Sequence, residues 1–157
     1  MTALRFIALP TDTARALRAG GPDANGQAPV RRVSDGAGIP CRHCLAPVAA
    51  GDPYLVLAHR PFPAAQPYAE TGPVFLHAGD CPRHGEDAGM PPMFRARETW
   101  LLRGYGADDW IVYGTGGPVP TRDLEARAAD LLARPDVAYL HLRSAQYNCF
   151  QCRIEEG

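Results

Sequence analysis

The sequence contains no lysine. All 16 of its basic residues are arginine, which excludes chemistry that needs a lysine amine, such as Schiff-base formation or the lysine of a phosphate-binding loop. The formal net charge of -1 gives no field that would attract a polyanion, so neither nucleic acid nor a membrane surface is an expected partner. Apart from histidine, the positively charged side chains are therefore all guanidiniums, which suit planar partners that accept two parallel hydrogen bonds.

Long apolar runs are missing as well. The run at Leu4–Leu9 is ended by Pro10 and is too short for a signal peptide, and no run approaches the roughly 20 residues of a membrane span. We therefore expect a cytoplasmic location, where thiols stay reduced or bind metal. The cysteine count of five agrees with this expectation, because one thiol would stay unpaired in any disulfide scheme.

Short β-rich runs between turn-forming residues predict most of the fold. The size of the chain is that of one domain, so residues 1–157 are predicted to form a single domain. Helices are expected at Thr11–Ala19 and from Thr121 to just before Pro135. Strands are expected at Leu4–Leu9, Val30–Val33, Tyr54–His59, Val74–His77, Thr99–Tyr105, Trp110–Gly114, Val137–Arg143 and Cys149–Ile154.

The connections between these runs indicate the fold class. Most strands are joined by hairpin-length or Pro/Gly-rich loops rather than by helices, which argues against a doubly wound parallel sheet. The sequence therefore predicts an α+β fold with a mainly antiparallel sheet, two short helices packed on one face and long Pro/Gly-rich loops.

Several cysteines and histidines stand at the spacing of metal ligands. Cys41 and Cys44 form a CxxC motif in a turn, where two thiolates can chelate one tetrahedral ion. His77 and Cys81 follow at a strand end and its loop. We predict a structural zinc site made of Cys41, Cys44, His77 and Cys81, with His84 or Cys149 as substitute ligands.

Cys149 and Cys152 form a second CxxC motif. It lies much farther from the first than the roughly 12–20 residues of the usual zinc motifs. Residues three apart on a strand also point to opposite faces, so both thiols would reach one ion only across a bend. This second pair is therefore not predicted to chelate a metal as a pair.

Two other interpretations of the thiols stay open. The cysteines can be ordinary residues without a metal, or one of them can be a redox or nucleophilic group. A thioredoxin-like role is disfavoured because Pro47 would end any helix that starts at Cys44. A nucleophilic Cys41 or Cys149 would need a histidine within reach, and His141, assisted by Arg42, is the candidate.

Scattered motifs resemble a bacterial family, domain of unknown function 1203. The resemblance runs from about residue 4 to 154 and implies no activity. It implies that Cys41 and Cys149 are the thiols that matter beyond any metal. It also implies a shared set of a thiol, a guanidinium, a phenol and an imidazole that would suit a small anionic ligand, with Arg42, Tyr68 and Arg103 as the ligand-binding residues and His141 as the imidazole. The motifs that carry it are Pro40-Cys41-Arg42, Pro67-Tyr68, Gly72-Pro73-Val74-Phe75, Leu102-Arg103-Gly104-Tyr105, Ala138-Tyr139-Leu140-His141 and Asn148-Cys149-Phe150.

These observations lead to two expectations about function. The first is a small domain without enzymatic activity that holds a structural zinc and binds a ligand or a partner. The alternative is an enzyme that uses the thiol of Cys41 or Cys149, with His141 and Arg42, for redox or nucleophilic chemistry.

Overall fold

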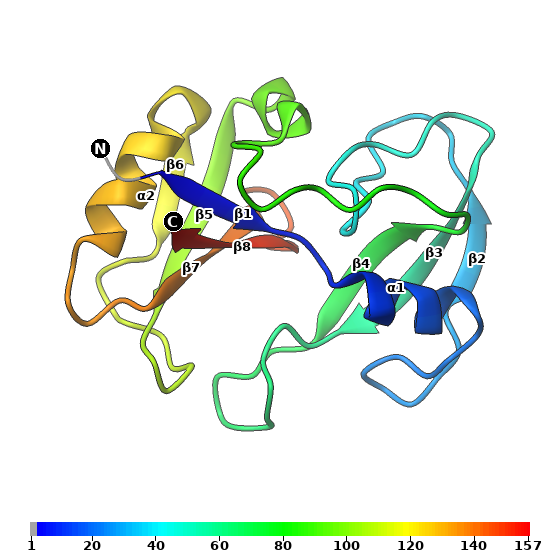
Figure 1. The fold of residues 1–157 in the computed structure, drawn as a ribbon, viewed down its shortest axis with the longest axis horizontal. Helices are drawn as coiled ribbons and strands as arrows, with labels where there is room; N and C mark the ends of the chain where they lie inside the picture. The colour runs from blue at the N-terminus through cyan, green and yellow to red at the C-terminus, as the bar shows by residue number, and fades with distance from the viewer. Residues whose placement is uncertain (1–2) are drawn as a thin grey trace.

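The strands form two antiparallel sheets in a computed structural model that describes residues 3–157 (Figure 1). The first sheet has five strands in the order β1-β8-β7-β5-β6, and the second has three in the order β2-β3-β4. The strands are β1 (Leu4–Ile7), β2 (Val30–Val33), β3 (Pro53–His59), β4 (Gly72–His77), β5 (Thr99–Tyr105), β6 (Gly117–Pro120), β7 (Tyr139–Ser144) and β8 (Phe150–Glu156).

The first sheet carries the larger apolar core. A 3-10 turn at Thr121–Asp123 leads into helix α2 (Leu124–Leu132), whose apolar face packs on this sheet. A second 3-10 helix, η1 (Pro92–Ala96), buries Phe94 against Trp100. The fully buried side chains of this core come from α2 and from the central strands, among them Trp100, Leu102, Leu124, Leu140, Leu142 and Ile154.

The second sheet has a thinner core. All four residues of β2 are exposed, so only β3 and β4 contribute buried side chains, among them Leu57 and Leu76. Helix α1 (Thr11–Arg18) covers this sheet with Ala14 and Leu17. Figure 1 shows how the chain leaves β1 in the first sheet and enters α1 beside the second.

The segment with the first CxxC motif joins the two halves of the molecule. Cys41 forms a parallel bridge with Phe75 of β4, and the Arg42 N–H donates to the Phe75 carbonyl at 2.9 Å. The Arg42 carbonyl accepts the N–H of Leu9, in the link between β1 and α1, also at 2.9 Å. The CxxC turn is therefore fixed to β4 on one side and to the β1–α1 link on the other.

The α+β class, the antiparallel pairing and the two helices confirm the fold expected from the sequence. The strands divide between two sheets, and each helix packs on a different one. The strand expected at Trp110–Gly114 is wrong: β6 lies beside β5, and the loop contributes only an isolated bridge between Tyr105 and Ile111. Among residues 3–157, no helix is both long and apolar enough to span a membrane.

Candidate functional site

Four side chains converge where the CxxC turn meets the end of β4. Cys41 and Cys44 come from the turn, His77 is the last residue of β4, and Cys81 lies in the following loop. One ligand atom from each lies within 4.8 Å of the other three. The sulfurs of Cys41 and Cys81 are 3.9 Å apart, and Cys44 Sγ is 3.4 Å from His77 Nδ1. Three thiols and an imidazole at these distances can hold one tetrahedral metal ion.

The backbone of the turn explains why its two thiols face the same side. The Cys41 N–H donates to the Ala46 carbonyl, and the Leu45 N–H donates to the Cys41 carbonyl, each at 3.0 Å. Leu45 has a φ of 52°, in the left-handed region that a side chain rarely adopts. Its side chain is 2% exposed and belongs to the core of the first sheet, so apolar packing stabilises the strained backbone.

The electrostatics of the cluster favour a thiolate at Cys41. A hydrogen bond from the Cys44 thiol holds the pKa of Cys41 well below the ordinary value of a thiol. Backbone N–H groups of His43, Cys44 and His77 add to this effect, while burial opposes it. The same thiol hydrogen bond raises the pKa of Cys44, and burial raises that of Cys81. Cys41 is therefore the thiol that most readily takes the form that binds metal.

Two residues that the sequence did not single out support Cys81. His43, inside the CxxC motif, places Nδ1 3.1 Å from Cys81 Sγ and Nε2 2.9 Å from the Thr11 hydroxyl. Arg18, in the last turn of α1, donates from Nη2 to Cys81 Sγ at 3.0 Å and from Nε to the His77 carbonyl at 2.9 Å. A guanidinium at this place offsets the negative charge of thiolates, and such supporting contacts orient metal ligands.

The two substitute ligands, His84 and Cys149, and the remaining cysteine, Cys152, lie elsewhere. The ring of His84 is hydrogen-bonded to the Gly89 carbonyl at 2.9 Å. Cys152 is fully buried in the core of the first sheet, and burial raises its pKa. Cys149 lies on the turn between β7 and β8. The cluster therefore consists of the leading set expected from the sequence, and neither substitute, His84 or Cys149, takes part in it.

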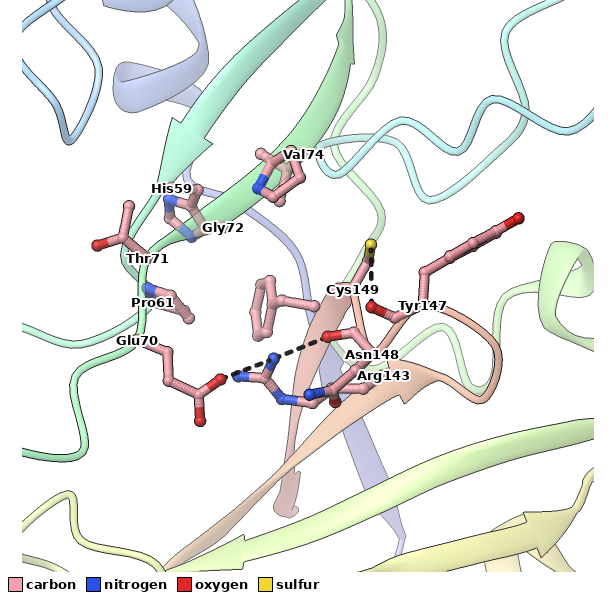
Figure 2. Close-up of a pocket in the computed structure, with 12 residues that line it drawn as sticks. His59, Pro61, Glu70, Thr71, Gly72, Val74, Arg143, Tyr147, Asn148 and Cys149 are labelled. Atoms are coloured by element: carbon pink, nitrogen blue, oxygen red, sulfur yellow. Dashed lines mark hydrogen bonds and ion pairs between the residues drawn. The ribbon is translucent and has the colours of Figure 1, made fainter.

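A cavity of about 450 Å³ separates the loop after β3 from the β7–β8 turn (Figure 2). His59 and Glu70 lie on one wall, and Arg143, Asn148 and Cys149 lie on the other. The Arg143 guanidinium lies 3.6 Å from the Glu70 carboxylate and donates to the Asn148 carbonyl at 3.1 Å. The charged groups of this cavity therefore compensate each other.

The comparisons with known proteins place the chain in a family. The profile of the family described as "Protein of unknown function (DUF1203)" matches residues 38–156. The chain belongs to this family. No curated protein and no solved structure matches it. The matched residues include the whole Cys/His cluster and both walls of the cavity, whereas α1 and Arg18 precede them.

Within this DUF1203 chain, the two catalytic candidates lie in different surroundings. The ring of His141 is fully buried among the aromatic rings of Phe62, Tyr105, Tyr139 and Phe150. Burial lowers its pKa well below the ordinary value, and neither ring nitrogen has a hydrogen-bond partner among residues 3–157. The Cys149 thiol donates to the Tyr147 carbonyl at 3.8 Å and faces the cavity. No hydrogen bond in the described part of the chain joins Cys149 to His141.

The three predicted ligand-binding residues of the DUF1203 chain also lie apart. Arg103 donates to the Glu70 carboxylate at 2.6 Å, and Glu70 also lies 3.6 Å from the Arg143 guanidinium. Tyr68 is half-buried and contacts two other aromatic residues, Trp110 and Tyr113. Arg42 lines a different cavity, on the other side of Cys149.

Proposed function

We propose that this protein is a small domain without enzymatic activity, in which Cys41, Cys44, His77 and Cys81 hold a structural zinc ion and the rest of the surface serves to bind a ligand. The observation that carries the proposal is the convergence of the four ligand atoms within 4.8 Å. A cytoplasmic location belongs to the proposal, because reduced thiols are needed for metal binding.

The donor set favours zinc. Three thiolates and one imidazole match the structural zinc sites that have three cysteines and one histidine, in which the ion is tetrahedral and redox-inert. Carboxylate and carbonyl donors, which calcium and magnesium prefer, take no part in the cluster. Soft sulfur donors also bind copper(I) and iron, so the identity of the metal is part of what the experiment decides.

Two features support a structural rather than a catalytic role. Four protein ligands complete a tetrahedral shell, whereas a catalytic zinc keeps a position open for water or substrate. The cluster also joins segments that are distant in the sequence, since it ties the CxxC turn to the end of β4 and, through Arg18, to α1. A metal there would fasten the second sheet, which has little apolar core of its own.

The alternative, an enzyme with a nucleophilic thiol, is less well supported. A nucleophilic cysteine needs a base within hydrogen-bond reach. Cys149 has a backbone carbonyl as its hydrogen-bond partner, and the imidazole of His141 is enclosed by aromatic rings. Cys41 would be occupied as a metal ligand.

Elemental analysis of protein purified without a chelator tests the zinc site. We expect about one zinc per chain in the wild type and less than about 0.2 in Cys44→Ser and Cys81→Ser, since each variant lacks one of four ligands. Cys149→Ser, which removes a thiol outside the cluster, is the matched control and should keep its zinc. If a variant does not fold, cobalt(II) added to the wild type replaces this comparison: it should give the visible absorption of tetrahedral, thiolate-bound cobalt. Wild-type protein that is folded and metal-free would overturn the proposal.

A further inference from the structure

The charged side chains that line a second cavity, of about 530 Å³, are all positive. It lies between the CxxC segment and Phe75 of β4 on one side and the β7–β8 turn on the other. Its charged lining residues are Arg42 and Arg97, and no carboxylate lines it. In the first cavity, by contrast, Glu70 compensates Arg143. The second cavity is therefore lined by two positive side chains and by no carboxylate of residues 3–157, and Cys149 lines both cavities.

Arg42 is buried without a carboxylate partner among the described residues. Its residue is 2% exposed, and no carboxylate of residues 3–157 lies within ion-pair distance. Nε donates to the Phe150 carbonyl at 2.7 Å and Nη1 donates to the Pro40 carbonyl at 2.8 Å, while Nη2 has no acceptor within the described chain. A guanidinium stays charged at neutral pH. A buried guanidinium with an unpaired donor is costly.

The two carbonyl contacts also orient the guanidinium. They use the donors on Nε and Nη1 and leave the donors on Nη2 free for a further acceptor. Arg97, whose guanidinium stacks over the Trp100 ring at 5.5 Å, is exposed at the rim and brings a second positive charge. Two guanidiniums facing one cavity are the usual means by which proteins hold carboxylates and phosphates.

A buried acceptor in the same wall narrows the class of ligand. Gln151 is 3% exposed and lines the cavity, and its Oε1 has no hydrogen-bond partner within residues 3–157. Its Nε2 is already used, because it donates to the Cys149 carbonyl at 3.2 Å. A buried oxygen of this kind needs a donor. A ligand that fits both features carries an oxyanion and also an O–H or N–H group.

The geometry points to a binding site for a small oxyanion that carries a hydrogen-bond donor, with its anionic group on Arg42 and Arg97 and its donor on Gln151. Monohydrogen phosphate and small hydroxy acids share this chemistry. The inference extends the ligand-binding part of the proposed function, and it rests on the metal site in one respect: Arg42 stands between two of the metal ligands, Cys41 and Cys44, which hold the turn.

Titration with four simple anions, followed by two-dimensional NMR of nitrogen-15-labelled protein, tests the site. We expect inorganic phosphate to shift the Arg42 Nε–H and Gln151 side-chain signals, and sulfate, which has the same shape without a donor at neutral pH, to bind roughly tenfold more weakly for the loss of one hydrogen bond. Glycolate against acetate makes the same comparison for a carboxylate. Whichever of phosphate and glycolate binds more tightly identifies the anionic group.

Variants of exposed arginines provide the control. Arg97→Gln should weaken binding of the better anion roughly tenfold, as expected for one charge-assisted contact. Because the Arg97 side chain is exposed, the substitution should leave the fold intact. Arg122→Gln makes the same change of charge on a side chain that is 82% exposed and outside the cavity, and should leave binding unchanged. Equal effects of both variants, or no shift with either phosphate or glycolate, would overturn the site. Sulfate binding as tightly as phosphate would overturn the role of Gln151.

The zinc content of each sample separates this inference from the proposed metal site. Anion binding by a wild type that contains no zinc would leave the anion site standing and end the structural zinc. A zinc-loaded wild type that binds neither phosphate nor glycolate would end the anion site and leave the structural zinc standing.

Discussion

The two sheets of this protein differ in the size of their apolar cores. The first sheet is built around large, fully buried apolar side chains, among them Trp100 and Leu102, and helix α2 closes its core. The second sheet has one strand, β2, whose four residues are all exposed, and its buried side chains are fewer and smaller. The Cys/His cluster stands at the end of β4 and borders the apolar core of the second sheet. Small units that lack sufficient apolar burial often use a metal or a disulfide, and the cluster could hold a metal ion for the second sheet.

Removing the metal should therefore affect the two sheets unequally, and this is the largest effect we expect. Metal binding to structural zinc sites supplies about 10–16 kcal/mol in isolated zinc fingers. Treatment with a chelator should remove at least roughly 4 kcal/mol of hydrogen-exchange protection from amides of β3 and β4, as part of that energy is lost. Amides of β5 and β7 should keep most of theirs. The measurement is native-state hydrogen exchange with and without chelator.

The same experiment on Cys149→Ser is its control, since that thiol lies outside the cluster. The variant should show the same dependence on chelator as the wild type. A uniform loss of protection in both sheets would mean that they unfold as one unit, and unchanged protection in β3 and β4 would mean that the second sheet does not depend on a metal.

The strands of both sheets could be read from local patterns, but their arrangement could not. The bounds of β2 and β5 match the predicted runs Val30–Val33 and Thr99–Tyr105, because turn-forming residues flank both. Trp110–Gly114 has a similar composition, yet its aromatic side chains pack against Tyr68, and β6 pairs with β5 in its place. Proline is tolerated in β6 because it is an edge strand. The choice of pairing partner is made by tertiary packing, which local patterns do not contain.

The ligands of the candidate metal centre were predictable for a different reason. The CxxC spacing brings Cys41 and Cys44 together within one turn, and His77 and Cys81 flank a single strand end. Arg18 gave no such signal, because its contact with Cys81 exists only once α1 has packed on the second sheet. Residues that support a metal ligand from a distant element are visible only in the folded chain.

Replacing Arg18 sharpens the comparison, because this residue connects α1 to the cluster. Arg18→Gln removes the donor to Cys81 Sγ and to the His77 carbonyl, and we expect zinc affinity to fall by about 10- to 100-fold, as for other residues that support metal ligands. Competition with a chromogenic chelator measures it. Arg15→Gln, in the same helix and 72% exposed, is the matched control. Equal affinities of the two variants would show that Arg18 has no part in the site.

The smallest expected effect concerns a polar residue in the well-packed first sheet. Burial lowers the pKa of His141 well below 6.5, so the unfolded chain takes up the proton more readily than the folded one. The stability that follows from a neutral His141 is therefore complete above about pH 6.5 and is lost as the pH falls below it, by at most about 1.4 kcal/mol for each pH unit. Replacement of His141 by leucine should remove this part of the pH dependence.

Urea unfolding of the wild type and of His141→Leu at pH 7.5 and at pH 5.5 measures that contribution. For each protein, the free energy of unfolding at pH 5.5 is subtracted from that at pH 7.5, and the two losses are then compared. Loss of metal in acid lowers the stability of both proteins and cancels in the comparison, so a smaller loss in the variant reports the histidine alone. An equal loss in both proteins would mean that His141 gains a proton in the folded state without penalty, through a partner or through water that reaches its ring. The first sheet would then be less tightly closed around His141 than its four aromatic neighbours indicate.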